Sequence, residues 1–271
     1  MMRALCFTVD FDRDVNVCIE GRLAAGSLDR GSGTSPRFGS SAEGLTVLTD
    51  LLDEMGVKAT FFAEGRTLDN ADNTGCLSGH EVGIHGLEHE DFTGCSGVTV
   101  NSAMLEAIIA RSVDIVKDCT GRRPVCSRAP YMKIDEYIYG ILHRHGIRYD
   151  SSEYAQLEVQ MHPYTVGPGI AEVPVPEGTD AAGNKISAYL WPMHEGKRRP
   201  DDYIRMASAV EDGIFCLGTH TWHMVESRKG GRMDGTERAV NKANVRRVLE
   251  GILDMGYKPM TVPSAADSFR T

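Results

Sequence analysis

Short apolar runs alternate with longer amphipathic segments along nearly the whole chain. The apolar runs are almost continuous, as in strands buried on both faces of a parallel sheet. They predict strands over residues 4–9, 57–62, 81–84, 124–127, 147–149, 170–175, 214–219 and 260–262. Apolar residues spaced three and four apart, or a proline opening a segment, predict helices between them. These helices are expected over residues 43–55, 104–119, 134–142, 200–209 and 240–253.

The order of these elements predicts the fold class. A strand followed by a helix recurs about seven times, which implies parallel strands joined by right-handed crossovers. The chain has 271 residues, which suits one domain spanning 1–271. We therefore predict an α/β barrel of the triosephosphate-isomerase type or a reduced variant. Ser40 and Glu43 predict a capping box at the start of the first helix. Residues 13–42 and 176–200 are expected to be irregular, and the sequence leaves open whether they cover a site.

Charge and hydropathy exclude several kinds of partner. The net charge of −9 argues against nucleic acid or an anionic membrane as the main partner. No apolar run reaches the ~18 residues that a membrane span requires. The first residues lack the apolar core of a signal peptide, because Asp10 comes too early. A cytoplasmic location is therefore expected, and a homo-oligomer is left open.

Polar residues gather where the predicted strands end. They are Asp10, Asp12, His85, His89, Arg128, Asp150 and His220. In a parallel barrel the carboxyl ends of all strands open on one face, and that face carries the chemistry. Each residue alone also has an ordinary structural explanation, such as a solvated acidic loop, a hydrogen-bonded histidine or a surface ion pair. The agreement among five separate strands favours a shared site.

Two of these histidines predict a metal centre. His85 and His89 lie four residues apart after a short strand, and imidazole is the commonest ligand for zinc and similar ions. Asp12 is the best third ligand, which leaves an open position on the cation for water or substrate. Zn²⁺ is the expected ion, with Co²⁺, Mn²⁺ or Ni²⁺ as alternatives. A non-haem iron oxygenase would use the same ligand types, but the strand–helix order fits it poorly.

Proton-transfer groups are predicted beside this centre. Asp10 shares a strand face with Asp12, because residues two apart point the same way. Asp10 is therefore expected to act as general base and His220 as general acid. Arg128 is expected to hold Asp10 ionised, and Asp150 to support His220. Trp191 could line a sugar or ring pocket, with buried packing as the alternative.

These residues resemble five sequence motifs of the polysaccharide deacetylases, carbohydrate esterase family four. The resemblance runs from Phe7 to about Val262. The motifs are matched in order by residues 8–12, 85–89, 128–131, 150–152 and 217–220. The resemblance implies a distorted (β/α)₇ barrel and metal-dependent hydrolysis of an N-acetyl group.

The resemblance also implies a role for individual residues. It gives Asp10 as base, His220 as acid, and Asp12, His85 and His89 as metal ligands. Arg128 would tether the base and Asp150 would support the acid. Around the substrate, the resemblance implies that the Tyr131 N–H would help to stabilise the oxyanion and that Leu217 would line the acetyl pocket. Pro130 and Trp191 are two further expected substrate contacts.

The sequence departs from the family pattern in two places. Phe11 separates two aspartates that are usually adjacent, and the fourth motif ends in Glu153-Tyr154, without the usual aromatic residue directly after an acidic pair. The first variant is similar to a subgroup of peptidoglycan deacetylase-like and allantoinase- or cyclic-imide-hydrolase-like proteins. The expected substrate is therefore an N-acetylated sugar or glycan, with a cyclic imide or ureide as the alternative. A carbohydrate-binding pseudoenzyme is the alternative from another class.

Overall fold

The computed structural model of the protein describes residues 2–13, 15–18, 25–27, 38–94, 101–228 and 230–269. Its first strands are β1 (Arg3–Phe11), β2 (Val15–Cys18), β3 (Ala25–Ser27), β4 (Thr60–Ala63), β5 (Glu81–Ile84), β6 (Cys126–Ser127) and β7 (Tyr149–Asp150). The later strands are β8 (Tyr154–Gln156), β9 (Gln160–Met161), β10 (Tyr164–Val166), β11 (Ile170–Glu172), β12 (Val175–Thr179), β13 (Lys185–Ser187), β14 (Asp212–His220), β15 (Glu226–Ser227), β16 (Gly231–Arg232) and β17 (Lys258–Pro259).

The helices lie mostly between these strands. The α-helices are α1 (Phe38–Met55), α2 (Gly65–Asp69), α3 (Ser102–Thr120), α4 (Glu136–Arg144), α5 (Trp191–His194), α6 (Pro200–Ser208), α7 (Gly235–Leu253) and α8 (Val262–Phe269). Three short 3₁₀ turns are η1 (Thr74–Leu77), η2 (Pro130–Met132) and η3 (Trp222–Met224). In the described residues no helix combines the length and apolarity needed to cross a bilayer.

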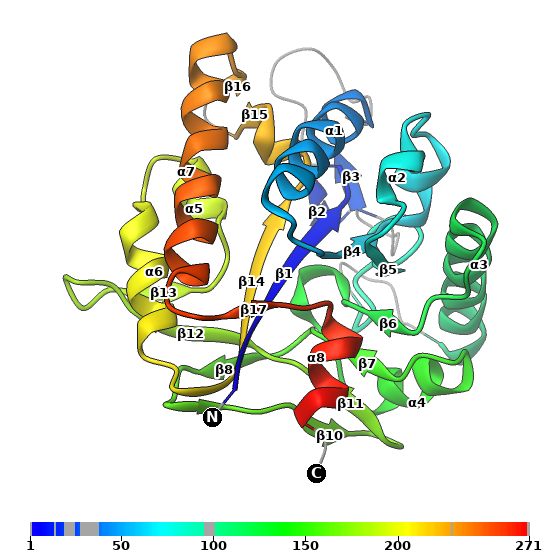
Figure 1. Cartoon of the computed structure of the whole chain (residues 1–271). Helices are drawn as coiled ribbons and strands as arrows, with labels where there is room; N and C mark the ends of the chain where they lie inside the picture. The colour runs from blue at the N-terminus through cyan, green and yellow to red at the C-terminus, as the bar shows by residue number, and fades with distance from the viewer. Residues whose placement is uncertain are drawn as a thin grey trace.

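One curled sheet organises the molecule (Figure 1). Its strand order is β10-β11-β7-β6-β5-β4-β1-β14-β9, and β17 pairs with β1. The run from β11 through β7, β6, β5, β4 and β1 to β14 is parallel at every step. The predicted α/β class with a distorted barrel is therefore confirmed. Since the strands run the same way, the carboxyl ends of β1, β5, β6, β7 and β14 meet on one face.

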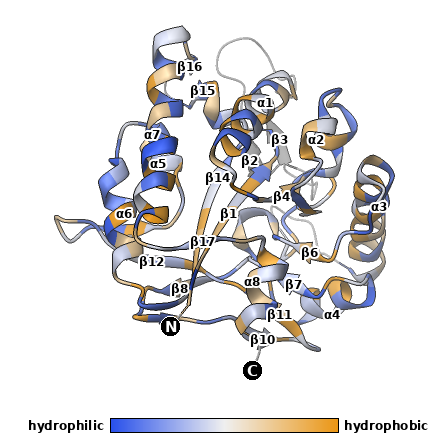
Figure 2. Ribbon diagram, in the orientation of Figure 1, coloured by the Kyte–Doolittle hydropathy of each residue, from blue (hydrophilic) through white to orange (hydrophobic). Residues whose placement is uncertain are grey.

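Helices cover the outside of this sheet, and Figure 2 shows that they carry both hydrophobic and hydrophilic residues. Helix α3 illustrates how such a helix is capped and which of its residues are buried. Asn101 caps its first turn by accepting a hydrogen bond from Met104 N, and Gly121 ends it in the left-handed conformation. Its buried stripe includes Leu105, Ile109 and Val116. Each such side chain contributes roughly 1.5–3 kcal/mol when removed from water.

Several predicted elements differ in the structure. Helix α1 begins at Phe38, and the Ser40 hydroxyl donates to Glu226 Oε2 at 2.6 Å, so the predicted capping box is wrong. Residues 260–262 are not a strand. The last strand is β17, and Val262 instead opens helix α8.

Both predicted loops contain regular structure. Within residues 13–42, β2 and β3 pair with each other, while residues 14, 19–24 and 28–37 lie outside the described part. Residues 176–200 include most of β12 together with β13 and α5. The short antiparallel pair β12–β13 was not predicted, because its charged and small residues show no clear alternation of hydrophobic and polar positions.

Candidate metal and catalytic site

Two buried carboxylates lie at the carboxyl end of β1. Asp10 lies near the end of β1 and Asp12 directly follows its last residue, Phe11. Both carboxylates are almost completely buried. Ionised carboxylates are buried in this way only when partners stabilise their charge.

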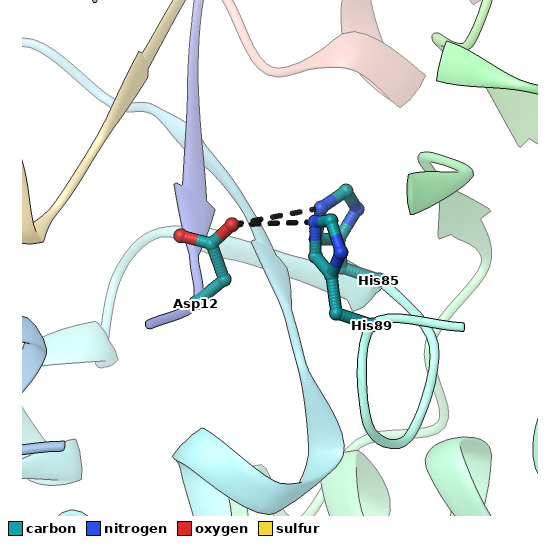
Figure 3. Close-up of side chains that lie close together, drawn as sticks. All are labelled: Asp12, His85 and His89. Atoms are coloured by element: carbon teal, nitrogen blue, oxygen red, sulfur yellow. Dashed lines mark ion pairs between the residues drawn. The ribbon is translucent and has the colours of Figure 1, made fainter. Parts of the chain in front are cut away.

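Asp12, His85 and His89 form a compact cluster (Figure 3). Asp12 Oδ2 lies 3.6 Å from His89 Nε2 and 3.9 Å from His85 Nε2. All three residues are buried, and one ligand atom of each lies within 4.8 Å of the others. Two ligands of a tetrahedral zinc ion are about 3.4 Å apart. One divalent cation therefore fits between these three side chains.

The chain around the histidines fixes their rings. His85 Nδ1 lies 2.8 Å from the carbonyl oxygen of Arg128, which leaves Nε2 directed at Asp12. Such a bond to the far ring nitrogen is the usual support of a metal-binding histidine. Burial lowers the pKa of both His85 and His89, so both imidazoles are neutral and able to coordinate at neutral pH.

A tight loop links the two histidines. Gly86 has φ +74°, and a Cβ there would lie 2.8 Å from Glu90 Oε2. Glu90 accepts hydrogen bonds from the Leu87 and Glu88 backbone N–H groups, each at 2.9 Å. Burial raises the pKa of Glu90 to about 7 despite these bonds. The loop is thus closed by its own carboxyl group.

Asp10 is held on both of its oxygens. Arg128 Nη1 donates to Oδ1 at 3.0 Å, and the Tyr189 hydroxyl donates to Oδ2. Burial alone would raise the pKa of Asp10, but Arg128 and then the nearby His85 and His220 outweigh it, and the pKa is lowered to about 2. The carboxylate is therefore ionised and oriented, as required of a general base.

His220 ends β14 beside this carboxylate. Its Nε2 lies 3.9 Å from Asp10 Oδ2, and its ring centroid is 5.2 Å from that of Tyr189. Burial lowers the pKa of His220 to about 3, so the imidazole is neutral at rest. Its Nδ1 is buried and has no hydrogen-bond partner among the described residues.

Among the described residues, no hydrogen bond joins the Asp150 carboxylate to His220. That carboxylate instead accepts a hydrogen bond from the Ser127 hydroxyl. It lies opposite Glu172 on the neighbouring strand β11. Burial raises the pKa of Asp150 to about 6 and that of Glu172 well above its ordinary value. The two carboxyls form a buried acid pair. Their protonated forms are favoured, because two negative charges buried side by side would repel each other.

A cavity of about 600 Å³ opens over these groups. Of the residues predicted to contact substrate, Tyr131 and Trp191 line it, together with Asp10, His85, His89 and His220. Leu217 and Pro130 are buried and are not among its lining residues. Leu217 pairs with Phe7 in the β1–β14 ladder, so it packs in the core before the strand turns polar.

The remaining lining residues were not predicted. They are Ala129, Met132, Tyr154, Glu177, Lys185, Ile186, Ser187, Tyr189, Pro192, Arg198 and Arg228. Many of them come from residues 176–200, where no periodic pattern identified elements. Arg228 lies 3.8 Å from the centre of the Trp191 ring, so a cation–π contact forms part of the wall.

Backbone strain is concentrated at this site. Among the described residues, three that are not glycine have positive φ: His89 (52°), Tyr131 (61°) and Met132 (56°). All three line the cavity. The rings of His89 and Tyr131 also meet edge to face, with centroids 4.6 Å apart.

Comparison with known proteins shows similarity to polysaccharide deacetylases. Residues 28–149 match the family model of polysaccharide deacetylase. The chain is 29% identical over 112 residues to a peptidoglycan deacetylase of Helicobacter pylori, covering 40% of this chain and 36% of that protein. It is 30% identical over 152 residues to a peptidoglycan deacetylase-like protein of Gibberella zeae, covering 54% and 42%. The chain thus spans less than half the length of these relatives.

Solved structures share the fold over nearly the whole chain. A protein of Mycobacterium smegmatis described as a polysaccharide deacetylase superposes with a TM-score of 0.64 at 20% identity, covering 99% of this chain and 90% of that one. An allantoinase superposes with a TM-score of 0.62 at 16% identity, covering 98% and 89%. Together the comparisons show that residues 28–149 are similar to polysaccharide deacetylases, and that the chain has the curled half-barrel fold of the solved structures of polysaccharide deacetylases and family 4 carbohydrate esterases.

Proposed function

We propose that this protein is a metal-dependent hydrolase that removes the acetyl group from an N-acetylated sugar or glycan. One observation carries the proposal. Asp12, His85 and His89 converge on one buried point, with Asp10 and His220 beside it in the same cavity. The match of residues 28–149 to polysaccharide deacetylases supports the choice of an acetyl amide as substrate.

The donor set suits zinc, since two neutral imidazoles and one carboxylate are typical of catalytic zinc sites. Co²⁺, Mn²⁺ and Ni²⁺ accept the same ligands. A bound divalent cation would lower the pKa of a water molecule and polarise the acyl carbonyl.

The chain's own residues would manage the protons. Asp10 would take the proton from the attacking water, because it is ionised and held by Arg128 and Tyr189. His220 would give a proton to the leaving nitrogen. It is neutral at rest, so it must first receive that proton. Asp10 Oδ2, which lies 3.9 Å away, is placed to pass it on.

Two features of the cavity limit the range of possible substrates. A cavity of about 600 Å³ is large enough for one or two sugar rings, and Trp191 offers an aromatic face in its wall. The second candidate is a cyclic imide or ureide, favoured by the shared fold with an allantoinase.

Acetate release tests the proposal. The purified protein, loaded in turn with Zn²⁺, Co²⁺, Mn²⁺ and Ni²⁺, is offered N-acetylglucosamine, its oligomers and peptidoglycan fragments. We expect acetate, loss of activity with a chelator, and restoration by added metal. Asp12→Ala should lose metal and at least about 10²-fold in kcat/KM. Asp53→Ala is the matched control, because that side chain is 78% exposed.

Other outcomes separate the alternatives. A metal-loaded protein that releases no acetate from any of these substrates would contradict the deacetylase proposal. Ring opening of a simple imide would then favour the second candidate. Tight glycan binding without turnover would favour a carbohydrate-binding pseudoenzyme.

A further inference from the structure

We propose that Tyr189 is a positioning residue of this site, whose hydroxyl fixes the orientation of the Asp10 carboxylate. No sequence pattern indicates this role, and the family resemblance assigns none to this position. The inference deepens the proposed function, and it rests on that function where Asp10 is treated as the base.

The first argument is the geometry of the carboxylate. A carboxylate that is bound on one oxygen only can rotate about its terminal torsion, which has a broad minimum. Here Arg128 Nη1 holds Oδ1 at 3.0 Å and the Tyr189 hydroxyl holds Oδ2. Oδ2 is also the oxygen that lies 3.9 Å from both His85 Nε2 and His220 Nε2. Tyr189 therefore fixes the oxygen that faces the reacting groups.

The second argument is the direction of the hydrogen bond. Burial and then the negative charge of Asp10 raise the pKa of the Tyr189 phenol well above its ordinary value. The proton therefore stays on the tyrosine, which can only donate to the ionised carboxylate. A hydrogen bond to a charged acceptor in a buried site is about twice as strong as a neutral one.

The third argument is that the surrounding chain is shaped around this ring. Tyr189 forms an isolated parallel bridge with Gly218 of β14. A Cβ on Gly218 would lie 2.6 Å from the Tyr189 ring, so only glycine leaves room for it. The Tyr203 hydroxyl, itself buried, donates to the Tyr189 carbonyl at 2.9 Å. The backbone and the ring of Tyr189 are thus both held in place.

The test is a double-mutant cycle between Tyr189→Phe and Asp10→Asn. Phenylalanine keeps the ring and removes the donor. We expect Tyr189→Phe to lower kcat about 10–100-fold, because small misplacement of a catalytic group costs this much. KM and bound metal should stay within about twofold of wild type. In the Asp10→Asn background the same change should lower kcat no further, since no base remains to be positioned.

Tyr257→Phe provides the matched control. That tyrosine is also buried, and its hydroxyl donates to the Ala207 carbonyl at 2.7 Å, outside the cavity lining. Its loss should leave kcat and KM unchanged. Gly218→Ala is a second variant of the site, and it should reproduce the fall in kcat by displacing the ring.

Three outcomes would overturn the role of Tyr189. They are an unchanged kcat in Tyr189→Phe, an equal loss in the Asp10→Asn background, or a rise in KM alone. The last result would make Tyr189 a substrate contact. A wild-type protein that is inactive on every substrate would contradict the proposed function but not this inference. In that case the same double-mutant cycle is measured by thermal unfolding. Additive shifts of the midpoint in Tyr189→Phe and Asp10→Asn would overturn the inference, and non-additive shifts would support it.

Discussion

Asp10 and His220 lie directly opposite each other on the neighbouring parallel strands β1 and β14, with His220 Nε2 3.9 Å from Asp10 Oδ2. Their alignment is the last step of a ladder that starts at Arg3 and Gly213. A slip of one residue would turn either side chain to the opposite face of the sheet. The two proposed proton-transfer groups are therefore placed together by strand register rather than by a flexible loop.

Replacing Arg128 should destabilise the fold as well as the site. Its guanidinium is buried and binds Asp10, Thr8 Oγ1 and both the carbonyl and hydroxyl oxygens of Ser151. Arg128→Met would leave the Asp10 charge buried without its main partner, which costs about 3–5 kcal/mol. Urea unfolding of the variant and the wild type measures this difference.

A second substitution shows whether Arg128 stabilises the fold through the charge of Asp10 or through its other contacts. If the cost arises from the unpaired carboxylate, Arg128→Met combined with Asp10→Asn should recover at least half of the lost free energy of unfolding. No recovery would mean that Arg128 stabilises the fold chiefly through Thr8 and Ser151.

Gly83→Ala should separate β5 from β6. A Cβ at Gly83 would lie 2.5 Å from the Cys126 carbonyl oxygen, a backbone atom that cannot rotate away. Overpacking of this kind typically costs about 1–3 kcal/mol. We expect a lower thermal midpoint and weaker metal binding, because His85 follows β5. Gly75→Ala is the control, since a Cβ on that glycine would have no neighbour within 4 Å. Equal midpoints for the two variants would contradict this account.

The buried pair of Asp150 and Glu172 should make stability depend on pH. A carboxyl whose pKa is raised on folding contributes stability below its unfolded pKa, and this contribution is lost as the pH rises through the folded value. For Asp150 that value is about 6. The window therefore runs from about pH 4 to about pH 6.

Asp150→Asn removes this titration. Between about pH 4 and pH 7 the stability of the wild type relative to the variant should fall by about 2–3 kcal/mol. Urea unfolding of both proteins across that range measures the change. A constant difference would show that Asp150 does not titrate there. If kcat instead fell as far as in a His220 variant, the predicted support of His220 by Asp150 would regain its basis.

Trp191→Ala should act on substrate binding. The ring lines the cavity and is packed against the Arg228 guanidinium, 3.8 Å away. Stacking of this kind contributes about 0.5–2 kcal/mol. We expect KM to rise roughly 3–30-fold with a smaller change in kcat. Trp191→Phe should recover much of the binding, whereas equal KM values for the alanine variant and wild type would remove Trp191 from the substrate site.

The site residues at strand ends were predictable, and the reason is geometric. Asp12, His85 and His89 each follow an apolar run, and parallel strands carry such positions to one face. Tyr189 was missed because it does not directly follow a strand of the parallel sheet. Its position depends on a single bridge to Gly218, a residue far along the sequence. The partly apolar run 186–190 and Gly218 were signals for its buried position, but not for its role.

Side-chain pairing was harder to predict than strand position. Asp150 was expected beside His220 because both lie at strand ends, yet its carboxyl pairs with Glu172 on the adjacent strand. Arg13 and Glu64 form a fully buried ion pair at 2.7 Å, although nothing in their local sequence relates them. Such pairs depend on sheet curvature and rotamers, which hydropathy does not encode.

The left-handed backbone at Tyr131 and Met132 sets a limit on engineering this protein. Non-glycine residues in that conformation typically cost about 1–2 kcal/mol each. A laboratory selection for heat resistance would therefore enrich glycine or asparagine there. Variants selected in this way would gain stability but lose the Tyr131 and Met132 side chains that line the cavity. Thermostability and turnover should therefore be screened together in any evolved library.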